Sequence, residues 1–189
     1  KAIGKSCVVT GSLIIKEDGN YYNRLIWMRP DGSFEYYDKR HLFRFAGENE
    51  YFSAGDKKLI VELKGWKVCP LICFDLRFPV WSRNQQDYDI LLYVANWPEV
   101  RSSAWKTLLK ARAHENQCYV VGVNRIGIDG KNIPYSGDSS AIDPKGMIIS
   151  KTQSSEESVE TIVLNYEELN QFREKFPVAL DADDFTISL

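Results

Sequence analysis

The most informative part of the chain is residues 66–79, which read WKVCPLICFDLRFP. Residues 66–74 are almost continuously apolar, as in a strand of a sheet that is covered on both faces. Charged residues follow, and Pro79 can open a short helix. We therefore predict a buried strand that turns into a helix at Cys73. A side chain at such a turn projects from the edge of the sheet, and the next backbone N–H, that of Phe74, can face an oxyanion.

The same alternation continues downstream. Residues 89–95 (DILLYVA) and 118–125 (CYVVGVNR) are two further apolar strands. Between them we predict a helix that Ser102 or Ser103 caps and that runs to about Gln117. Strands that alternate with helices in this way form parallel or mixed sheets, so the class is α/β.

Hairpins flank this central part. Upstream, three short β-branched or aromatic runs form a predicted antiparallel meander: residues 6–16, 21–28 and 33–37. The polar residues 39–58 form a predicted long ordered loop, of a kind that compact domains usually keep for function. Downstream we predict three short strands and a closing helix: residues 139–143, 147–151 and 159–164, and then 166–175. No repeat or linker divides the chain, so residues 1–189 form one predicted domain.

The composition argues against several classes of protein. The chain has 189 residues, 24 basic and 26 acidic side chains, and a net charge of −2. No basic block marks a nucleic-acid binder, and no apolar run approaches the roughly 20 residues of a membrane span. Four scattered cysteines are too few for a disulfide scaffold, so we expect a cytoplasmic protein.

Cys73 is the candidate nucleophile, although a buried structural cysteine is the simpler interpretation of its context. A thiol nucleophile needs a base or a cation nearby. Lys39 can supply the cation, and Glu48 or Glu50 in the same loop can orient it or handle protons. The two histidines, His41 and His114, are too few for a metal site, so we predict no metal.

Substrate contacts are expected at the carboxyl edge of the sheet, where α/β proteins usually bind ligands. Asn96 and Trp97 follow the strand 89–95 and should lie at this edge. Arg101 follows closely and could bind a carboxylate.

Several motifs together resemble the nitrilase (carbon–nitrogen hydrolase) superfamily: YDKRHLF at 37–43, CFDLRFP at 73–79, ARAHEN at 111–116, NRIG at 124–127, GDS at 137–139 and DPKG at 143–146. They cover most of the chain in the expected order. Two more, WSRN at 81–84 and YVANWP at 93–98, are similar to the bacterial omega-amidase branch.

This resemblance implies an α-β-β-α four-layer sandwich, a homodimer or higher homo-oligomer, and an enzyme without a cofactor. Cys73 would be the nucleophile, Lys39 the triad lysine and Glu48 the additional glutamate of the family. Lys39 and the N–H of Phe74 would form the oxyanion hole. The implied reaction is hydrolysis of the terminal amide of a short dicarboxylic monoamide such as 2-oxoglutaramate. Arg101 or Arg77 would hold the free carboxylate of this small-molecule substrate.

One feature departs from the family pattern, in which the first triad residue is a glutamate far upstream of the lysine. Only 38 residues precede Lys39, and Glu17 and Glu35 both belong to the predicted meander. We therefore expect a domain that lacks its first strands and helices, and no turnover by the 189-residue chain alone.

Three alternatives stay open: an amidase or carbamoylase with another substrate, an inactive binding member of the fold, or an unrelated redox protein that uses Cys69 and Cys73. The last requires rearrangement, because the two Cα atoms on one strand would lie about 13 to 14 Å apart.

Overall fold

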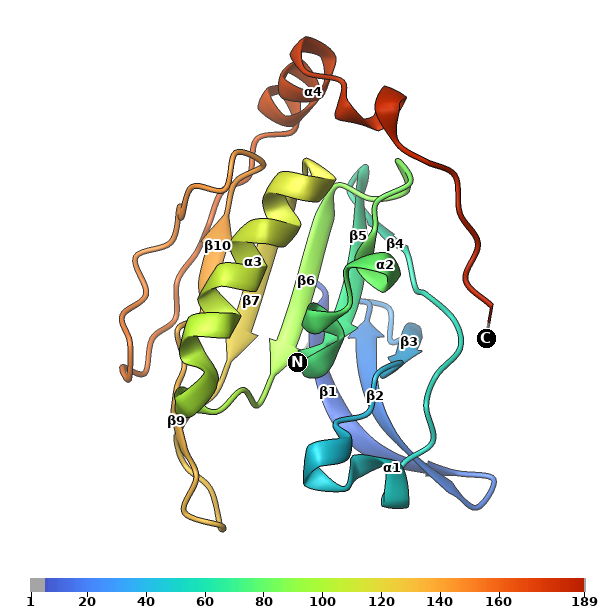
Figure 1. Cartoon of the computed structure of the whole chain (residues 1–189), viewed down its shortest axis with the longest axis vertical. Helices are drawn as coiled ribbons and strands as arrows, with labels where there is room; N and C mark the ends of the chain where they lie inside the picture. The colour runs from blue at the N-terminus through green and yellow to red at the C-terminus, as the bar shows by residue number, and fades with distance from the viewer. Residues whose placement is uncertain (1–5, 189) are drawn as a thin grey trace.

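A five-stranded mixed sheet forms the centre of the structure, a computed structural model that describes residues 6–188 (Figure 1). Its strands lie in the order β10 (Ser140–Ile142), β7 (Tyr119–Asn124), β6 (Ile90–Ala95), β5 (Trp66–Ile72) and β4 (Val61–Leu63). The three inner strands are parallel, and the edge strands are antiparallel to them. Cys69, Leu91 and Val120 lie side by side in this register, and none of them is exposed to solvent. The predicted α/β class is confirmed.

Helix α3 (Ser102–Asn116) covers one face of this sheet, with the short helix α2 (Pro79–Ser82) beside it (Figure 1). Trp105 and Leu109 are fully buried between the helix and the sheet. A Cβ atom at Gly122 in β7 would lie 2.6 Å from Leu109 and 2.8 Å from Trp105. Glycine at this position therefore lets α3 pack directly onto the strand. Among residues 6–188, no helix is long and apolar enough to cross a membrane.

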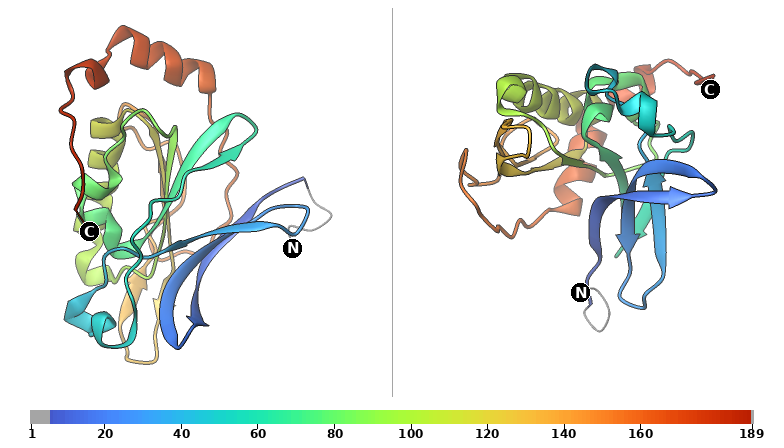
Figure 2. Two further views of the ribbon diagram at one scale, coloured as in Figure 1. Left: turned by 90° about the vertical axis from the view of Figure 1, so that its right-hand side faces the viewer. Right: turned by 90° about the horizontal axis from the view of Figure 1, so that it is seen from below.

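A three-stranded meander packs on the opposite face, as the left view of Figure 2 shows. It consists of β1 (Val9–Glu17), β2 (Asn20–Met28) and β3 (Phe34–Asp38). Its inner face buries Leu25, Trp27 and Tyr37 against the core. The described residues thus build a helix layer and two sheet layers. In this part of the chain no helix lies on the outer face of the meander, where Leu13 is 59% exposed.

Helix α4 (Tyr166–Lys175) lies at the end of the central sheet from which its parallel strands start (Figure 1). Its first residue packs edge-on against Trp66 at the start of β5. Arg173 forms an ion pair with Asp89 at 2.8 Å, just before β6. The opposite edge, where these strands end, is free of this helix.

Most elements lie where the sequence predicts them, and the exceptions are short or unpaired. The predicted strand 159–164 is wrong, because these residues are extended but have no neighbouring strand within the described chain, and Val159 and Val163 are exposed. The predicted strand 147–151 is reduced to a single bridge between Ile142 and Ile148. The predicted loop 39–58 contains a 3₁₀ turn and the one-turn helix α1 (Glu48–Tyr51).

Three short strands escape the sequence analysis: β4, β8 (Ile126–Ile128) and β9 (Pro134–Ser136). Each has three residues, which is too short for a period-2 pattern to stand out.

Candidate active site

Cys73 lies at the sharp turn where β5 ends and a 3₁₀ turn over Cys73–Arg77 begins. Its φ angle is +46°, a left-handed conformation that costs a non-glycine residue about 1–3 kcal/mol. Its Sγ lies 3.9 Å from the carbonyl oxygen of Asn96 at the end of β6. The thiol is therefore held at the carboxyl edge of the sheet and remains partly exposed, whereas Cys69 on the same strand is fully buried.

Lys39 follows the last strand of the meander, and its backbone is fixed from two sides. Its N–H donates to the carbonyl of Asn23 at 2.9 Å, and its carbonyl accepts from the N–H of Gly55 at 3.0 Å. A Cβ atom at Gly55 would lie 2.2 Å from the carbonyl oxygen of Asp38, so only glycine permits this contact. The Lys39 residue is 1% exposed, and a buried ammonium needs an anionic partner.

Glu48 supplies that partner. It begins helix α1, directly after Gly47 in the left-handed conformation. Its Oε2 atom accepts from Nζ of Lys39 at 2.6 Å and from the N–H of Phe43 at 2.6 Å. This one carboxylate oxygen therefore pairs with the charge of Lys39 and also bonds to the backbone of the loop between Lys39 and Glu48.

Burial raises the pKa of the Cys73 thiol, and the neighbouring Lys39 ammonium opposes the rise. The carboxylates of Glu48 and Asp75 act in the same direction as burial. The pKa stays above its ordinary value, so the protonated thiol prevails at pH 7 and attack requires a base. Burial raises the pKa of Cys69 to about 12, which makes that thiol inert.

The predicted substrate contacts lie at the same edge but differ in access. Asn96 is exposed, and the Arg101 guanidinium lies 5.0 Å from the centre of the Phe43 ring, over the loop that carries Lys39. Arg77 is exposed above the Trp97 ring at 5.2 Å. Trp97 itself is 3% exposed, and its indole N–H already donates to the carbonyl of Arg101. Its contact with a substrate therefore stays a prediction, which the indole N–H does not supply because it is already bonded.

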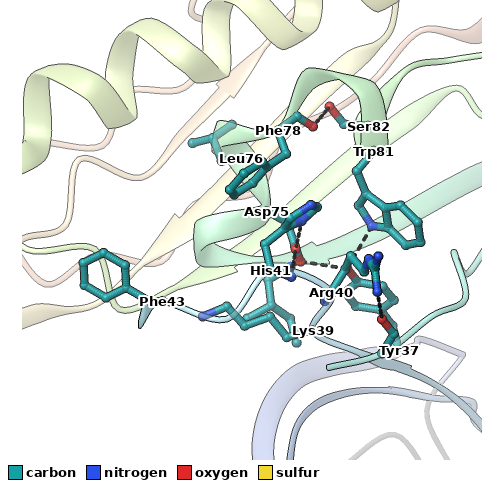
Figure 3. Close-up of polar contacts among 12 residues, drawn as sticks. Tyr37, Lys39, Arg40, His41, Phe43, Asp75, Leu76, Phe78, Trp81 and Ser82 are labelled. Atoms are coloured by element: carbon teal, nitrogen blue, oxygen red, sulfur yellow. Dashed lines mark hydrogen bonds and ion pairs between the residues drawn. The ribbon is translucent and has the colours of Figure 1, made fainter. Parts of the chain in front are cut away.

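Sequence reasoning missed the buried carboxylate of Asp75, which joins the two sides of the site (Figure 3). It accepts hydrogen bonds from Tyr37 and His41 on one side and from Ile72 on the other. A signal was available, because Asp75 is the only acidic residue between Trp66 and Pro79. A charged residue in so apolar a stretch is either exposed or paired.

Tyr135 on β9 was also missed. Burial and the carboxylate of Asp129 raise the pKa of its phenol, Arg125 opposes the rise, and Cys73 adds the smallest contribution. The Arg125 guanidinium lies 4.7 Å from the centre of the Tyr135 ring. Arg125 and Tyr135 thus meet where β7 leads into the β8–β9 hairpin. Its sequence signal was the NRIG motif at 124–127, which carries no obvious chemistry by itself.

Both histidines have partners within the described part of the chain. His41 is bonded to Asp75, and the His114 ring packs against Gly146 so closely that a Cβ atom there would lie 2.1 Å from Nε2. Over residues 6–188 no group of three or more His, Cys, Asp or Glu side chains could hold a metal ion.

Comparison with known proteins identifies the family. The family model for the carbon-nitrogen hydrolases matches residues 4–174. The chain is 46% identical over 187 residues to the omega-amidase YafV of Escherichia coli K12, an alignment that covers 99% of this chain and 73% of that protein. The chain belongs to the carbon–nitrogen hydrolase family. This membership excludes the unrelated redox protein as an alternative.

Other family members support the same branch and fold. The chain is 36% identical over 174 residues to a 2-oxoglutaramate amidase of Bacillus subtilis, which covers 90% of this chain and 66% of that protein. XC1258 of Xanthomonas campestris, a CN-hydrolase superfamily protein solved with an arsenic adduct in its active site, is 44% identical and superposes with a TM-score of 0.94 over 97% of this chain and 72% of that chain. The predicted nitrilase-type α/β fold is confirmed. Because the family match begins at residue 4, it gives no support to the expectation of a domain without its first strands and helices.

Proposed function

We propose that this carbon–nitrogen hydrolase is an omega-amidase, which hydrolyses the terminal amide of a short dicarboxylic monoamide such as 2-oxoglutaramate and releases ammonia. The observation that carries the proposal is the strained Cys73 turn beside the buried Lys39–Glu48 pair. The similarity to omega-amidase YafV and to a 2-oxoglutaramate amidase supports the choice of substrate.

In the proposed reaction, Sγ of Cys73 attacks the amide carbon while the thiol proton passes to a carboxylate base, in the family pattern a glutamate other than Glu48. The carbonyl oxygen becomes an oxyanion, which the Lys39 ammonium and the N–H of Phe74 stabilise. The C–N bond then breaks, and the nitrogen leaves as ammonia after taking up a proton. Water attacks the resulting thioester, which releases the carboxylic acid and restores the thiol.

Glu48 has a supporting part in this scheme. Its bonds to Lys39 and to the N–H of Phe43 hold the ammonium in one place. A preorganised cation lowers the barrier because it does not have to reorient as charge develops. We assign Glu48 the orientation of Lys39 and the handling of protons during ammonia release.

We assign the free carboxylate of the substrate to Arg101 in preference to Arg77. Arg101 lies over Phe43, four residues after Lys39 in the loop that carries the lysine, whereas Arg77 lies over Trp97. Arg101→Met should raise KM with little change in kcat, because the lost contact is made equally in the ground and transition states. Arg77→Met is the matched control and should leave KM near the wild-type value.

The decisive experiment measures ammonia release from 2-oxoglutaramate and succinamate by the protein expressed from its complete gene. Release that Cys73→Ala abolishes supports the proposal. Release only from N-carbamoyl compounds would assign the site to a carbamoylase. No release from any of these compounds by a folded protein would favour an inactive binding member. The same assay on the 189-residue chain tests the expected lack of turnover, for which the comparisons give no support.

We also infer a homodimer or higher homo-oligomer in the cytoplasm, as the family resemblance implies. All four cysteines are free thiols, which fits a reducing compartment. Light scattering on the purified protein measures the mass of the assembly, and a monomeric mass would overturn the first inference.

A further inference from the structure

The two reactive side chains of the proposed site come from different sheets. Lys39 follows β3 of the meander, and Cys73 follows β5 of the central sheet. The reaction requires both to face one carbonyl group, and a misplacement of about 1 Å can cost 10²-fold in rate. Something must therefore fix the end of one sheet against the end of the other.

The carboxylate of Asp75 makes this connection, as Figure 3 shows. Its Oδ1 accepts from the backbone N–H of His41 at 2.9 Å and from Nδ1 of His41 at 2.8 Å. Its Oδ2 accepts from the hydroxyl of Tyr37 at 2.8 Å and from the N–H of Ile72 at 3.1 Å. Asp75 itself is 0% exposed. Three of the four donors lie on the segment that carries Lys39, and the fourth belongs to the residue before Cys73.

The partners of Asp75 are themselves fixed. Burial first, and then the Asp75 charge, raise the pKa of Tyr37 well above its usual range, so the phenol stays protonated and donates. The same hydroxyl oxygen accepts from the N–H of Arg40 at 3.1 Å and from the indole N–H of Trp81 at 3.0 Å. The His41 ring stacks on the Phe78 ring with centroids 3.7 Å apart. Residues 37–41 are thereby pinned on both sides of Lys39.

We propose that Asp75 is the positioning residue of this site, which holds the Lys39 segment in register with the Cys73 turn through Tyr37 and His41. It is no general base, because its two oxygens already accept four hydrogen bonds within the protein. It acts on the reaction only through the placement of Lys39. The inference rests on the proposed function, because it assigns the contact that this function needs.

Loss of a hydrogen bond to Asp75 should produce a specific defect. If Lys39 moves away, the oxyanion loses a cationic donor and the Cys73 thiolate loses its stabilising charge. kcat should then fall while KM changes little, and alkylation of Cys73 should require a higher pH. The charged groups that shift the pKa of Cys73 are Lys39, Glu48 and Asp75, and Tyr135 is a further titratable group whose own pKa responds to Cys73. Since Glu48 and Asp75 are negative, Lys39 is the one group among these four that favours the thiolate.

A matched pair of variants tests the connection at His41. His41→Asn keeps an N–H donor close to the position of Nδ1, and His41→Leu has the same branching without the donor. We expect kcat within about threefold of wild type for His41→Asn and a loss of about tenfold or more for His41→Leu, the effect of one hydrogen bond to a charged group. Asp75→Asn removes the charge and should lower kcat about 10²-fold.

The second readout is the rate of iodoacetamide alkylation at Cys73 as a function of pH, measured by peptide mass spectrometry on the full-length protein. A Cys7→Ser background removes the exposed competing thiol, whereas Cys69 and Cys118 are buried. We expect the pH profile of His41→Leu to shift upward and that of His41→Asn to match wild type. A purely structural role would lower the melting temperature and leave the profile of the folded protein in place.

Two results would overturn the proposal: equal kcat and equal alkylation profiles for His41→Asn and His41→Leu, or a wild-type kcat in Asp75→Asn. The alkylation assay needs no turnover. If wild type releases no ammonia but the profiles still separate, the proposed function fails and the positioning role of Asp75 stands.

Discussion

Glu48→Gln should destabilise the protein more than most exposed-loop substitutions, because it leaves the Lys39 ammonium buried without a counter-charge. The two side chains are 2% and 20% exposed, and Nζ lies 2.6 Å from the carboxylate oxygen. Breaking a buried ion pair from one side costs about 3–5 kcal/mol. Since Glu48 is partly exposed, we expect the lower end, about 3 kcal/mol. For a chain of this size that lowers the melting temperature by about 6–12 °C.

A double variant separates the charge from the hydrogen bond. In Lys39→Met/Glu48→Gln no buried charge is left, and the glutamine oxygen can still accept from the N–H of Phe43. We expect this variant to recover to within about 1 kcal/mol of wild type, because replacement of both partners of a buried pair is often neutral. Urea denaturation of the four proteins in the cycle measures the coupling. An unchanged stability of Glu48→Gln alone would refute the reasoning, since it would mean that another group neutralises Lys39.

Three further outcomes are expected. Cys73→Ala should lower kcat for ammonia release by at least about 10⁴-fold, as loss of a nucleophile does in other covalent hydrolases. Gly55→Ala should cost about 1–3 kcal/mol in urea denaturation, because its Cβ would strike the Asp38 carbonyl, whereas Gly130→Ala meets no atom within 4 Å and should change stability little. Burial raises the pKa of Asp138, but hydrogen bonds from a lysine ammonium and from serine hydroxyls outweigh it and hold that pKa at about 2. Its contribution of about 1–2 kcal/mol is therefore complete above pH 4 and lost as the pH falls toward 2, and Asp138→Asn should flatten the acid limb of the stability profile.

The elements that the sequence predicted best are those in which local pattern and tertiary packing agree. The closing helix begins and ends where predicted, at Tyr166 and Lys175. Its first turn is capped, because the Asn165 side chain accepts from the N–H groups of Glu167 and Glu168. The buried strand before Cys73 is equally clear, since a continuous apolar run leaves few alternatives. The turn at Cys73 follows from that strand and from the proline-started helix after it.

The pairing of Lys39 with Glu48 and the Asp75 connection follow from no local pattern. Asp75 lies 38 residues from Tyr37 and 34 from His41, and their contact exists only because two sheets pack face to face. Sequence spacing places Lys39 in a loop but cannot say that its side chain is buried. The strand predicted at 159–164 shows that local propensity alone is not enough. Its residues have strand propensity, but a strand forms only beside a partner, and residues 6–188 provide none there.

The two edges of the central sheet differ in how far their polar groups are satisfied, and this difference locates the chemistry. At the edge where the parallel strands begin, Asp89 accepts from Arg173 at 2.8 Å and from the N–H of Lys67 at 3.0 Å, so each oxygen of its carboxylate has a donor. At the other edge, the Cys73 thiol makes a long contact of 3.9 Å to a carbonyl and sits on a strained backbone. Backbone strain of this kind persists only where the surrounding structure holds it. Here that support is the network of Asp75, which is why we place the control of reactivity in a residue that never meets the substrate.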